Sequence, residues 1–205
     1  MSRYTKKVEK RGQLIVIAGP MFSNKSGELL RQVVVREIAG QKVAVLKHQL
    51  DSRYAGKHFI STHGGSRREA KALGSSAEVE VAASGMEVVA VDEAQFFDAG
   101  LPGVVRRLMN AGVNVIASGL DTNFRGEGFG PMPELLAMAD EVMKLRAVCM
   151  KCKSLEGTMT QRLIDGQPAD WDAPLILVGA AESYEARCRN CHEVGKGRGV
   201  AAPEA

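Results

Sequence analysis

The sequence lacks several features that mark other classes of protein. Aromatic residues make up only 5% of the 205-residue chain, and the formal net charge is only +3. With so little charge and no basic stripe interleaved with aromatic residues, there is no reason to expect nucleic acid or an anionic membrane as a partner. The chain has no apolar run long enough to cross a bilayer and no internal repeats.

The amino terminus also lacks an apolar segment. Residues 2–11 are polar and basic, and the h-region of a secretory signal does not follow them. We therefore expect a cytoplasmic protein in which residues 1–11 form a flexible arm. Residues 195–205 have little to bury, and we expect them to form a disordered tail.

Cysteine is scarce, but its placement is informative. The four cysteines form two CxxC pairs, Cys149 with Cys152 and Cys188 with Cys191. In a reducing compartment such pairs predict a tetrahedral Zn²⁺ site, and four protein ligands would make that zinc structural. Three other interpretations are a redox pair, a haem-attachment string over residues 188–192, and His192 replacing Cys191 as the fourth ligand.

The stretch Gly19-Pro-Met-Phe-Ser-Asn-Lys-Ser26 lies between an apolar run, residues 14–18, and apolar residues at helical spacing up to Ile38. Strand, tight loop ending in Lys-Ser, and helix together predict a phosphate-binding P-loop. Lys25 would then reach the terminal phosphates and Ser26 would hold Mg²⁺. The alternative is an ordinary strand–turn–helix with a surface lysine.

The P-loop pattern has two departures. Asn24 stands where the pattern requires glycine, but asparagine accepts a left-handed backbone more readily than most residues, so we expect the loop to close. Gly27 follows Ser26 and costs up to about 1 kcal/mol relative to alanine in a helix.

A second apolar run, residues 88–91, ends in Asp92 and Glu93. Adjacent carboxylates at the end of a buried strand are typical of the acidic half of a P-loop site. Successive side chains alternate along a strand, so Asp92 could hold the Mg²⁺ shell while Glu93 faces the substrate. The alternative is a strand end capped by charges.

Two polar segments also follow apolar runs. Residues 47–54 include Asp51 and Arg53, which are either ligand groups or a solvated ion pair. Residues 121–131 form a glycine-rich loop that is either a ligand cover or a mobile connector.

The alternation of strands and helices predicts an α/β fold with a P-loop, RecA-like, mostly parallel sheet and helices on both faces. We expect a nucleotide-binding domain over residues 12–147 and a zinc-binding lasso domain over 148–194. In the lasso domain, residues 159–164 and 175–178 would form a hairpin-like pair. The remaining expected elements are strands at 43–46, 58–60, 79–81, 113–120 and 141–145, and helices at 66–73, 101–108 and 132–139.

Four motifs together resemble the type II thymidine kinase family over residues 12–194. They are the P-loop string; Asp92-Glu-Ala-Gln-Phe-Phe; Gly119-Leu-Asp-Thr-Asn-Phe-Arg-Gly-Glu followed by Phe129-Gly-Pro-Met; and Gly179 followed by Glu182-Ser-Tyr-Glu-Ala-Arg-Cys-Arg and Cys191. The resemblance implies transfer of the ATP γ-phosphoryl group to the 5′-hydroxyl of thymidine, which gives dTMP.

The resemblance also implies roles for single residues. Glu93 would accept the hydroxyl proton, Lys25 and Arg53 would stabilise the transition state, and Ser26 and Asp92 would hold Mg²⁺. The implied ATP site comprises Gly19, Pro20, Met21, Phe22, Ser23, Asn24, Lys25, Ser26, Asp92, Glu93, Ala94 and Gln95. The implied thymidine site comprises Met21, Asp51, Phe96, Leu120, Phe124, Phe129, Thr160, Arg162, Val178, Gly179 and Tyr184.

In this family the thymidine pocket is closed by a lasso between the zinc knuckles, here about residues 159–184. The resemblance further implies a homotetramer that is inhibited by dTTP. Two other hypotheses are a P-loop ATPase with a zinc ribbon that nucleic acid stimulates, and a nucleotide sensor without catalysis.

Overall fold

The computed structural model describes residues 11–50, 59–61, 67–176 and 182–197 of the chain. Most of the expected amino-terminal arm and carboxyl-terminal tail therefore lies outside the described residues. Among the described helices, none combines the length and apolar character that a membrane span requires.

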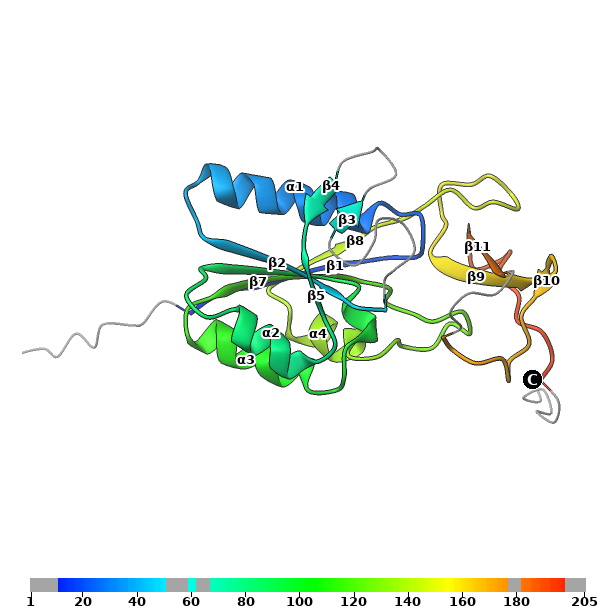
Figure 1. Ribbon diagram of the computed structural model, residues 1–205. Helices are drawn as coiled ribbons and strands as arrows, with labels where there is room; N and C mark the ends of the chain where they lie inside the picture. The colour runs from blue at the N-terminus through cyan, green and yellow to red at the C-terminus, as the bar shows by residue number, and fades with distance from the viewer. Residues whose placement is uncertain (1–10, 51–58, 62–66, 177–181, 198–205) are drawn as a thin grey trace, which may run out of the picture.

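Within the described residues, six parallel strands form the central sheet in the order β5-β2-β6-β7-β1-β8 (Figure 1). The inner strands β1 and β6 are buried along their whole length, and they are apolar except for Asp92 at the end of β6, as expected for parallel strands covered on both faces. The strands are β1 (Leu14–Ala18), β2 (Val43–His48), β5 (Lys71–Leu73), β6 (Val88–Asp92), β7 (Asn114–Gly119) and β8 (Glu141–Lys144).

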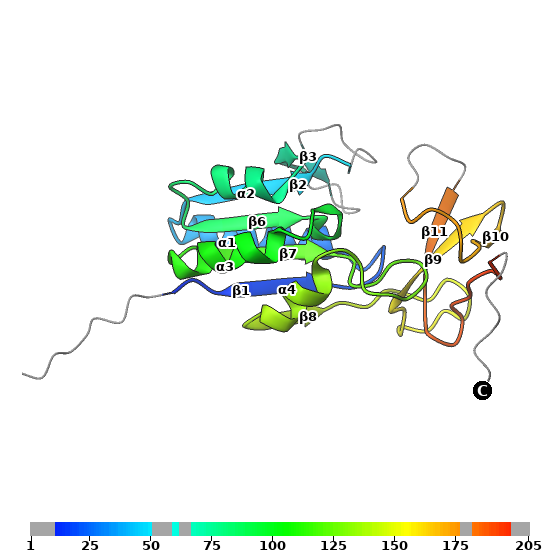
Figure 2. The same ribbon diagram turned by 90° about the horizontal axis from the view of Figure 1, so that it is seen from below.

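Helices cover both faces of this sheet, which confirms the predicted α/β fold. Helix α1 (Lys25–Ile38) packs on one face, and α2 (Ser76–Ala82), α3 (Leu101–Asn110) and α4 (Met132–Met138) lie on the other (Figures 1 and 2). Alternate residues of β1, β2, β6 and β7 supply the two cores. All strands of this sheet run parallel, so their carboxyl ends meet at one edge, where polar residues follow β1, β2, β6 and β7.

Helix α1 ends where the sequence indicates. Leu29, Leu30 and Val33 are buried against the sheet. Gly40 takes a left-handed φ of 80°, and its N–H donates to the carbonyl of Glu37 at 2.8 Å. Glycine adopts this conformation without the steric cost of a Cβ, so Gly40 terminates the helix.

Residues 66–73 were predicted to be helical, and this prediction is wrong. The described part forms two short strands, β4 (Arg67–Glu69) and β5. Strand β4 pairs antiparallel with β3 (Phe59–Ser61), and β5 extends the central sheet beside β2. Tertiary pairing overrides the weak helical preference of this charged segment because Ala70 and Leu73 become buried.

The predicted strand at residues 79–81 is also wrong, because this segment lies in α2. Ser75 caps the helix by accepting a hydrogen bond from the N–H of Glu78, and the Glu78 carboxylate accepts one from the N–H of Gly74 at 2.8 Å. The Ser-x-x-Glu spacing is a capping-box signal that outweighs the alternation of valine and glutamate.

A separate three-stranded sheet has the order β10-β9-β11, with β9 (Met159–Ile164), β10 (Gln167–Pro168) and β11 (Glu182–Arg187). In the described residues β9 pairs with β10 and β11, and residues 175–176 are in no strand, contrary to the predicted pairing of 159–164 with 175–178; residues 177–178 lie outside the described residues. Asp165 and Gly166 both have positive φ and form a two-residue turn that fixes the β9–β10 register. This small sheet lies beyond the carboxyl edge of the central sheet (Figure 2).

Candidate active site

The P-loop connects β1 to α1 at the carboxyl edge of the sheet. Phe22 and Asn24 have left-handed φ values of 66° and 63°. Left-handed residues in a short loop are the backbone conformation from which concave anion-binding nests are built. The expectation that Asn24 accepts the left-handed conformation is confirmed.

Side chains of the loop fold over its own backbone. Lys25 Nζ donates to the carbonyl of Pro20 at 2.6 Å, and Ser23 Oγ donates to the same oxygen at 2.8 Å. Both side chains are buried although they are polar. The lysine is therefore held above the amino end of α1, where the helix dipole also favours negative charge.

The acidic pair lies at the same edge. Asp92 ends β6 and is buried, and the N–H of Glu93 donates to Asp92 Oδ1 at 3.0 Å. Strand β7 separates β6 from β1, and strands lie about 4.8 Å apart, so the two strands are about 10 Å apart. That separation leaves room for a phosphate chain between the acidic pair and the P-loop.

Gln95 orients the carboxylate of Glu93. Glu93 has a left-handed φ of 53° and begins the short helix η1 (Ala94–Phe96). The buried Gln95 side chain donates from Nε2 to Glu93 Oε2 and accepts at Oε1 from the N–H of Leu120 at 3.0 Å. Glu93 is thus linked through Gln95 to the end of β7. Ala94 points instead into the hydrophobic core.

The glycine-rich loop after β7 is closed by its own hydrogen bonds. Asn123 Oδ1 accepts from the N–H groups of Arg125 and Glu127 at 2.8 and 3.1 Å. The backbone N–H of Asn123 donates to the carbonyl of Glu127 at 2.9 Å, and an isolated β-bridge joins Thr122 to Gly128. The segment is an ordered turn that faces the small sheet.

One face of the small sheet meets the P-loop and this loop. Thr160 Oγ1 accepts a hydrogen bond from the N–H of Met21 at 3.1 Å. Arg162 lies two residues further along the same strand, is 0% exposed, and its guanidinium lies 5.2 Å from the Phe124 ring centre. Tyr184 pairs with Arg162 across the sheet and shares that face.

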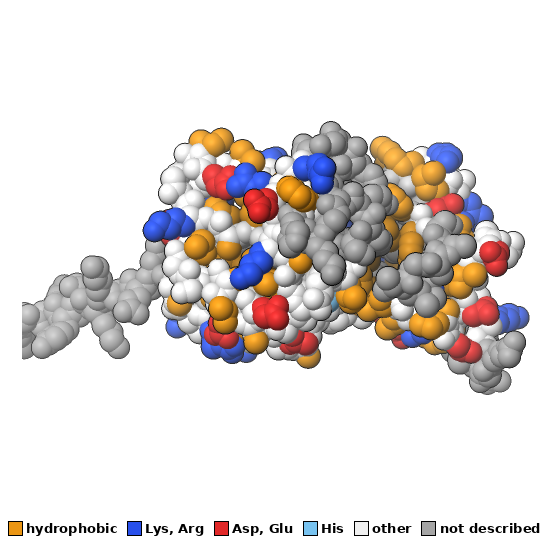
Figure 3. Space-filling model, in the orientation of Figure 1, with side chains coloured by type: hydrophobic (Ala, Val, Ile, Leu, Met, Phe, Trp, Pro, Cys, Tyr) orange, Lys and Arg blue, Asp and Glu red, His pale blue; other side chains and the backbone are white. Residues whose placement is uncertain are grey.

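The other aromatic residues of the implied thymidine site lie near the acidic pair. The rings of Phe96 and Phe129 are 5.7 Å apart in an edge-to-face arrangement, and Leu120 is buried beside Gln95. Figure 3 shows hydrophobic side chains gathered on the part of the surface that carries the small sheet. Asp51, Arg53, Val178 and Gly179 lie outside the described residues.

The four cysteines form one cluster. Their sulfur atoms all lie within 4.8 Å of one another, and Cys152 Sγ is 3.8 Å from Cys188 Sγ. A tetrahedral site with Zn–S bonds of about 2.3 Å has sulfur–sulfur distances of about 3.8 Å. The cysteines are free thiols in the structure. Their geometry therefore fits a zinc site formed by four sulfur ligands.

The electrostatics of the cluster also fit a cation. Burial opposes ionisation of Cys149, but backbone hydrogen bonds from Cys152 and Cys188 outweigh it and lower the pKa of Cys149 to about 6. Contact with Cys188, together with burial, raises the pKa of Cys191 to about 12. Four close sulfurs cannot all ionise by themselves, and a divalent cation removes this conflict.

The sequence model of the thymidine kinase family matches residues 12–192, which is most of the chain. The chain belongs to the thymidine kinase family. Membership makes it a kinase at the level of the family and confirms the resemblance that the four motifs indicated. The matched range includes the P-loop segment, the acidic pair and all four cysteines.

His192 does not replace a cysteine in this thymidine kinase family member. Its Nε2 lies 2.9 Å from the carbonyl oxygen of Phe124, away from the sulfur cluster. Because a carbonyl oxygen can only accept, the tautomer with the proton on Nε2 is the one that makes this hydrogen bond. Burial lowers the pKa of His192 and so favours the neutral ring.

The candidate site also contains a buried lysine that was not predicted from the sequence. Lys47 is 1% exposed, and its Nζ donates to the carbonyl of Phe59 at 2.9 Å. Its Cα is the register partner of Asp92 on the neighbouring strand. The sequence signal for Lys47 was its position directly after an apolar run. A charged residue that is buried at such a position usually requires a partner.

The two departures in the P-loop fit each other. A Cβ added at Gly27 would lie 2.7 Å from Cγ of Asn24, so the asparagine side chain fills the space that a larger residue would need. The Asn24 carbonyl also accepts the N–H of Glu28 at 3.1 Å. Glycine at position 27 therefore accommodates asparagine at position 24.

We expect the change that Gly27→Ala makes in the free energy of unfolding to be less favourable in the native background than in the Asn24→Gly background. In the native background the new methyl group must displace the Asn24 side chain. Once Asn24→Gly has removed that side chain, Gly27→Ala should stabilise the protein by about 1 kcal/mol, because alanine is preferred over glycine in a helix. Free energies of unfolding in urea for the four proteins of this cycle should show a coupling of about 1 kcal/mol or more. Effects that add within about 0.5 kcal/mol would contradict the contact.

His48 makes stability depend on pH. Its buried ring packs edge-to-face on Phe97 at 4.7 Å, and Nδ1 accepts from the N–H of Leu50 at 3.2 Å. Burial lowers the pKa of His48, although a hydrogen bond to Gly74 and the charges of Asp98 and Glu78 oppose this shift.

Because the folded pKa is below the unfolded value of about 6.5, the unfolded chain binds the proton first as pH falls. The stability contributed by neutral His48 is present above about pH 6.5 and is lost as pH falls through the folded pKa. We expect His48→Asn, which keeps an acceptor for Leu50, to show a smaller decrease in unfolding free energy from about pH 7.5 to about pH 5.5. Equal decreases in both proteins, measured by urea denaturation, would rule out this role.

Proposed function

We propose that this protein is a thymidine kinase that transfers the γ-phosphoryl group of ATP to the 5′-hydroxyl of thymidine, giving dTMP and ADP. The observation that carries the proposal is the meeting of the P-loop and the Asp92–Glu93 pair at one sheet edge, faced by the small sheet. Family membership supplies the reaction class.

The chain's own residues divide the chemistry between them. Glu93, fixed by Gln95, would accept the proton of the 5′-hydroxyl as the oxygen approaches the γ-phosphorus. Lys25 would leave the Pro20 carbonyl to contact the terminal phosphates, while backbone N–H groups of the loop hold the phosphate chain. Phosphoryl transfer depends mainly on such positioning and on charge neutralisation.

Ser26 and Asp92 are the residues that would hold Mg²⁺, which when bound neutralises charge on the phosphates. Arg53 would be the transition-state arginine by resemblance. Loss of one such cation typically lowers the rate by about 10³-fold or more.

Thymidine would bind between the P-loop edge and the small sheet. Met21, Phe124, Thr160, Arg162 and Tyr184 are described on facing segments, which supports this location. Zinc at the four cysteines would fix both ends of the lasso. Residues 12–147 are proposed as the nucleotide-binding domain and residues 148–194 as the zinc-binding lasso domain.

A homotetrameric assembly and feedback inhibition by dTTP at the ATP site are proposed on family resemblance. A cytoplasmic location and the absence of a nucleic-acid or membrane partner are proposed on the low net charge and the sequence pattern. Gel filtration with light scattering tests the assembly, and inhibition by dTTP that is competitive with ATP tests the regulation.

The test is direct. Purified protein with Mg-ATP is incubated with thymidine, deoxyuridine or deoxycytidine, and nucleoside monophosphate and ADP are quantified by chromatography. We expect dTMP and ADP in equal amounts, and a loss of activity in Lys25→Ala. ATP hydrolysis that is indifferent to thymidine but raised by single-stranded DNA would favour the ATPase instead. ATP binding in calorimetry without any transfer would favour a nucleotide sensor.

A further inference from the structure

His192 lies between the cysteine cluster and the glycine-rich loop. Its backbone belongs to the second knuckle, since its N–H donates to the carbonyl of Cys188 at 3.0 Å. Its side chain leaves the knuckle and contacts the carbonyl oxygen of Phe124, 68 residues earlier in the sequence. The residue therefore joins two segments that the chain order keeps far apart.

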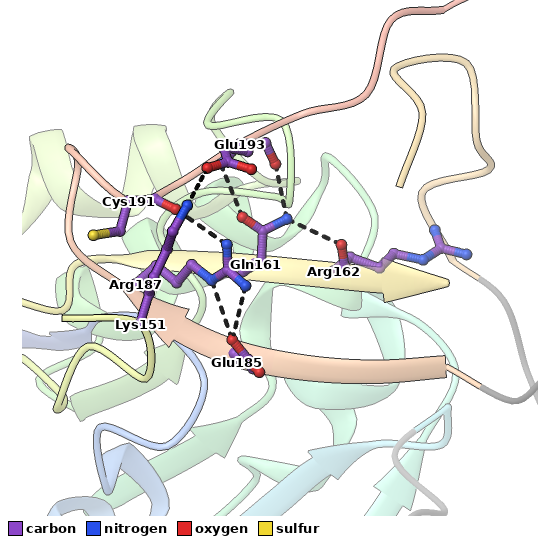
Figure 4. Close-up of polar contacts among 7 residues, drawn as sticks. All are labelled: Lys151, Gln161, Arg162, Glu185, Arg187, Cys191 and Glu193. Carbon is purple, nitrogen blue, oxygen red and sulfur yellow. Dashed lines mark hydrogen bonds and ion pairs between the residues drawn. The ribbon is translucent and has the colours of Figure 1, made fainter. Parts of the chain in front are cut away.

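The backbone on both sides of His192 is fixed (Figure 4). The Gln161 side chain makes two hydrogen bonds to the backbone of Glu193, at 2.8 and 2.9 Å, and Gln161 is 1% exposed. Arg187 donates to the carbonyl of Cys191 at 3.2 Å, and Lys151 pairs with the Glu193 carboxylate. These contacts come from β9, β11 and the first knuckle, so the position of the His192 ring follows the position of the whole zinc-binding region.

The other end of the contact is Phe124, whose side chain is buried. The guanidinium groups of Arg125 and Arg162 lie 5.3 and 5.2 Å from the centre of its ring. Arg125 also donates to the carbonyl of Ala173 at 3.0 Å, and Arg162 donates to that of Pro174. The ring of Phe124 is thus in contact with both arginines that hold residues 173–174, while its carbonyl is held by His192.

We propose that His192 is a positioning residue that transmits the geometry of the cysteine cluster to Phe124 and so shapes the nucleoside side of the pocket. The nucleoside part of this inference rests on the proposed function. The Nε2–H donor matters because a partly buried carbonyl oxygen without a hydrogen-bond partner costs more free energy than one hydrogen bond contributes net to stability. His192 acts through Phe124 and does not contact the reacting groups.

The experiment compares His192→Leu, which removes the donor at similar size, with His192→Gln, whose amide nitrogen can reach the place of Nε2. Arg189→Gln changes an exposed residue of the same knuckle and is the control. Zinc content, steady-state kinetics and amide hydrogen exchange are measured on the full chain. We expect His192→Leu to keep its zinc and its kcat, to raise the KM for thymidine about tenfold, and to exchange faster over residues 121–130. His192→Gln should restore most of the native KM for thymidine and most of the native exchange rate over residues 121–130.

Several results would overturn the proposal. Loss of zinc in His192→Leu would make His192 part of the metal site. Unchanged exchange over residues 121–130, or a Gln variant as impaired as the Leu variant, would show that the donor does not position Phe124. If the native protein does not phosphorylate thymidine, the proposed function fails, and the exchange measurement still decides whether His192 positions the loop.

Discussion

Glu93→Gln is expected to leave the protein folded and able to bind both substrates while kcat falls about 10²- to 10⁴-fold. An amide oxygen can still accept the hydrogen bond from Gln95, so the local geometry is kept. The amide cannot take the proton of the 5′-hydroxyl. The loss corresponds to about 3–5 kcal/mol of transition-state stabilisation.

The measurement is steady-state kinetics together with calorimetric Kd values for thymidine and an ATP analogue. Glu134→Gln, an exposed carboxylate on α4, is the matched control and should behave as the native enzyme. Full turnover in Glu93→Gln would remove Glu93 as the base. A variant that fails to bind thymidine would instead assign Glu93 to substrate binding.

Removal of zinc, by chelation or by Cys149→Ser, is expected to raise the KM for thymidine by at least about tenfold before the ATP-binding part unfolds. The cluster joins the chain after β8 to the end of β11, so without it the two ends of the lasso are held only by the pairing of β9 with β11. The central sheet contains none of the four ligands, and its two cores remain intact.

Trp171 is the only tryptophan in the chain, and it lies in the lasso with the Arg125 guanidinium 5.6 Å from its ring centre. Its fluorescence should therefore report loss of the lasso structure, while calorimetry follows ATP. Met150→Ser changes an exposed residue inside the first knuckle without removing a sulfur ligand, and should retain zinc and KM. Metal-free protein with a native KM would show that zinc has no structural role here.

Much of the fold could be predicted because its signals are local. Apolar runs at 14–18 and 88–91 indicated buried strands, and apolar residues at helical spacing up to Ile38 indicated α1. The errors arose where partners are distant in sequence. Residues 67–73 form strands only because β2 and β3 lie beside them, and β9 pairs with β11 across a long connection.

In the candidate site, too, the features carried by local motifs could be predicted and those that depend on distant contacts could not. The P-loop, the acidic pair and the CxxC pairs are short motifs, so their chemistry follows from residue type and spacing. The interlock of Asn24 with Gly27 and the burial of Lys47 beside Asp92 depend on side-chain directions that only coordinates supply. From the sequence, His192 could be part of a haem-attachment string or a zinc ligand. In the structure its ring contacts the carbonyl oxygen of Phe124 instead.

By itself, the sequence indicated the family through the resemblance of four motifs. It also predicted the phosphate cradle, the carboxylates and the metal ligands, because each of these depends on chemical groups held at fixed short spacings. The tertiary structure decided which of these groups face one another, how the small sheet approaches the P-loop, and what holds Phe124 and Glu93 in place. Those contacts join residues tens of positions apart, and the free energy of burying and hydrogen-bonding them arises only once the chain has folded.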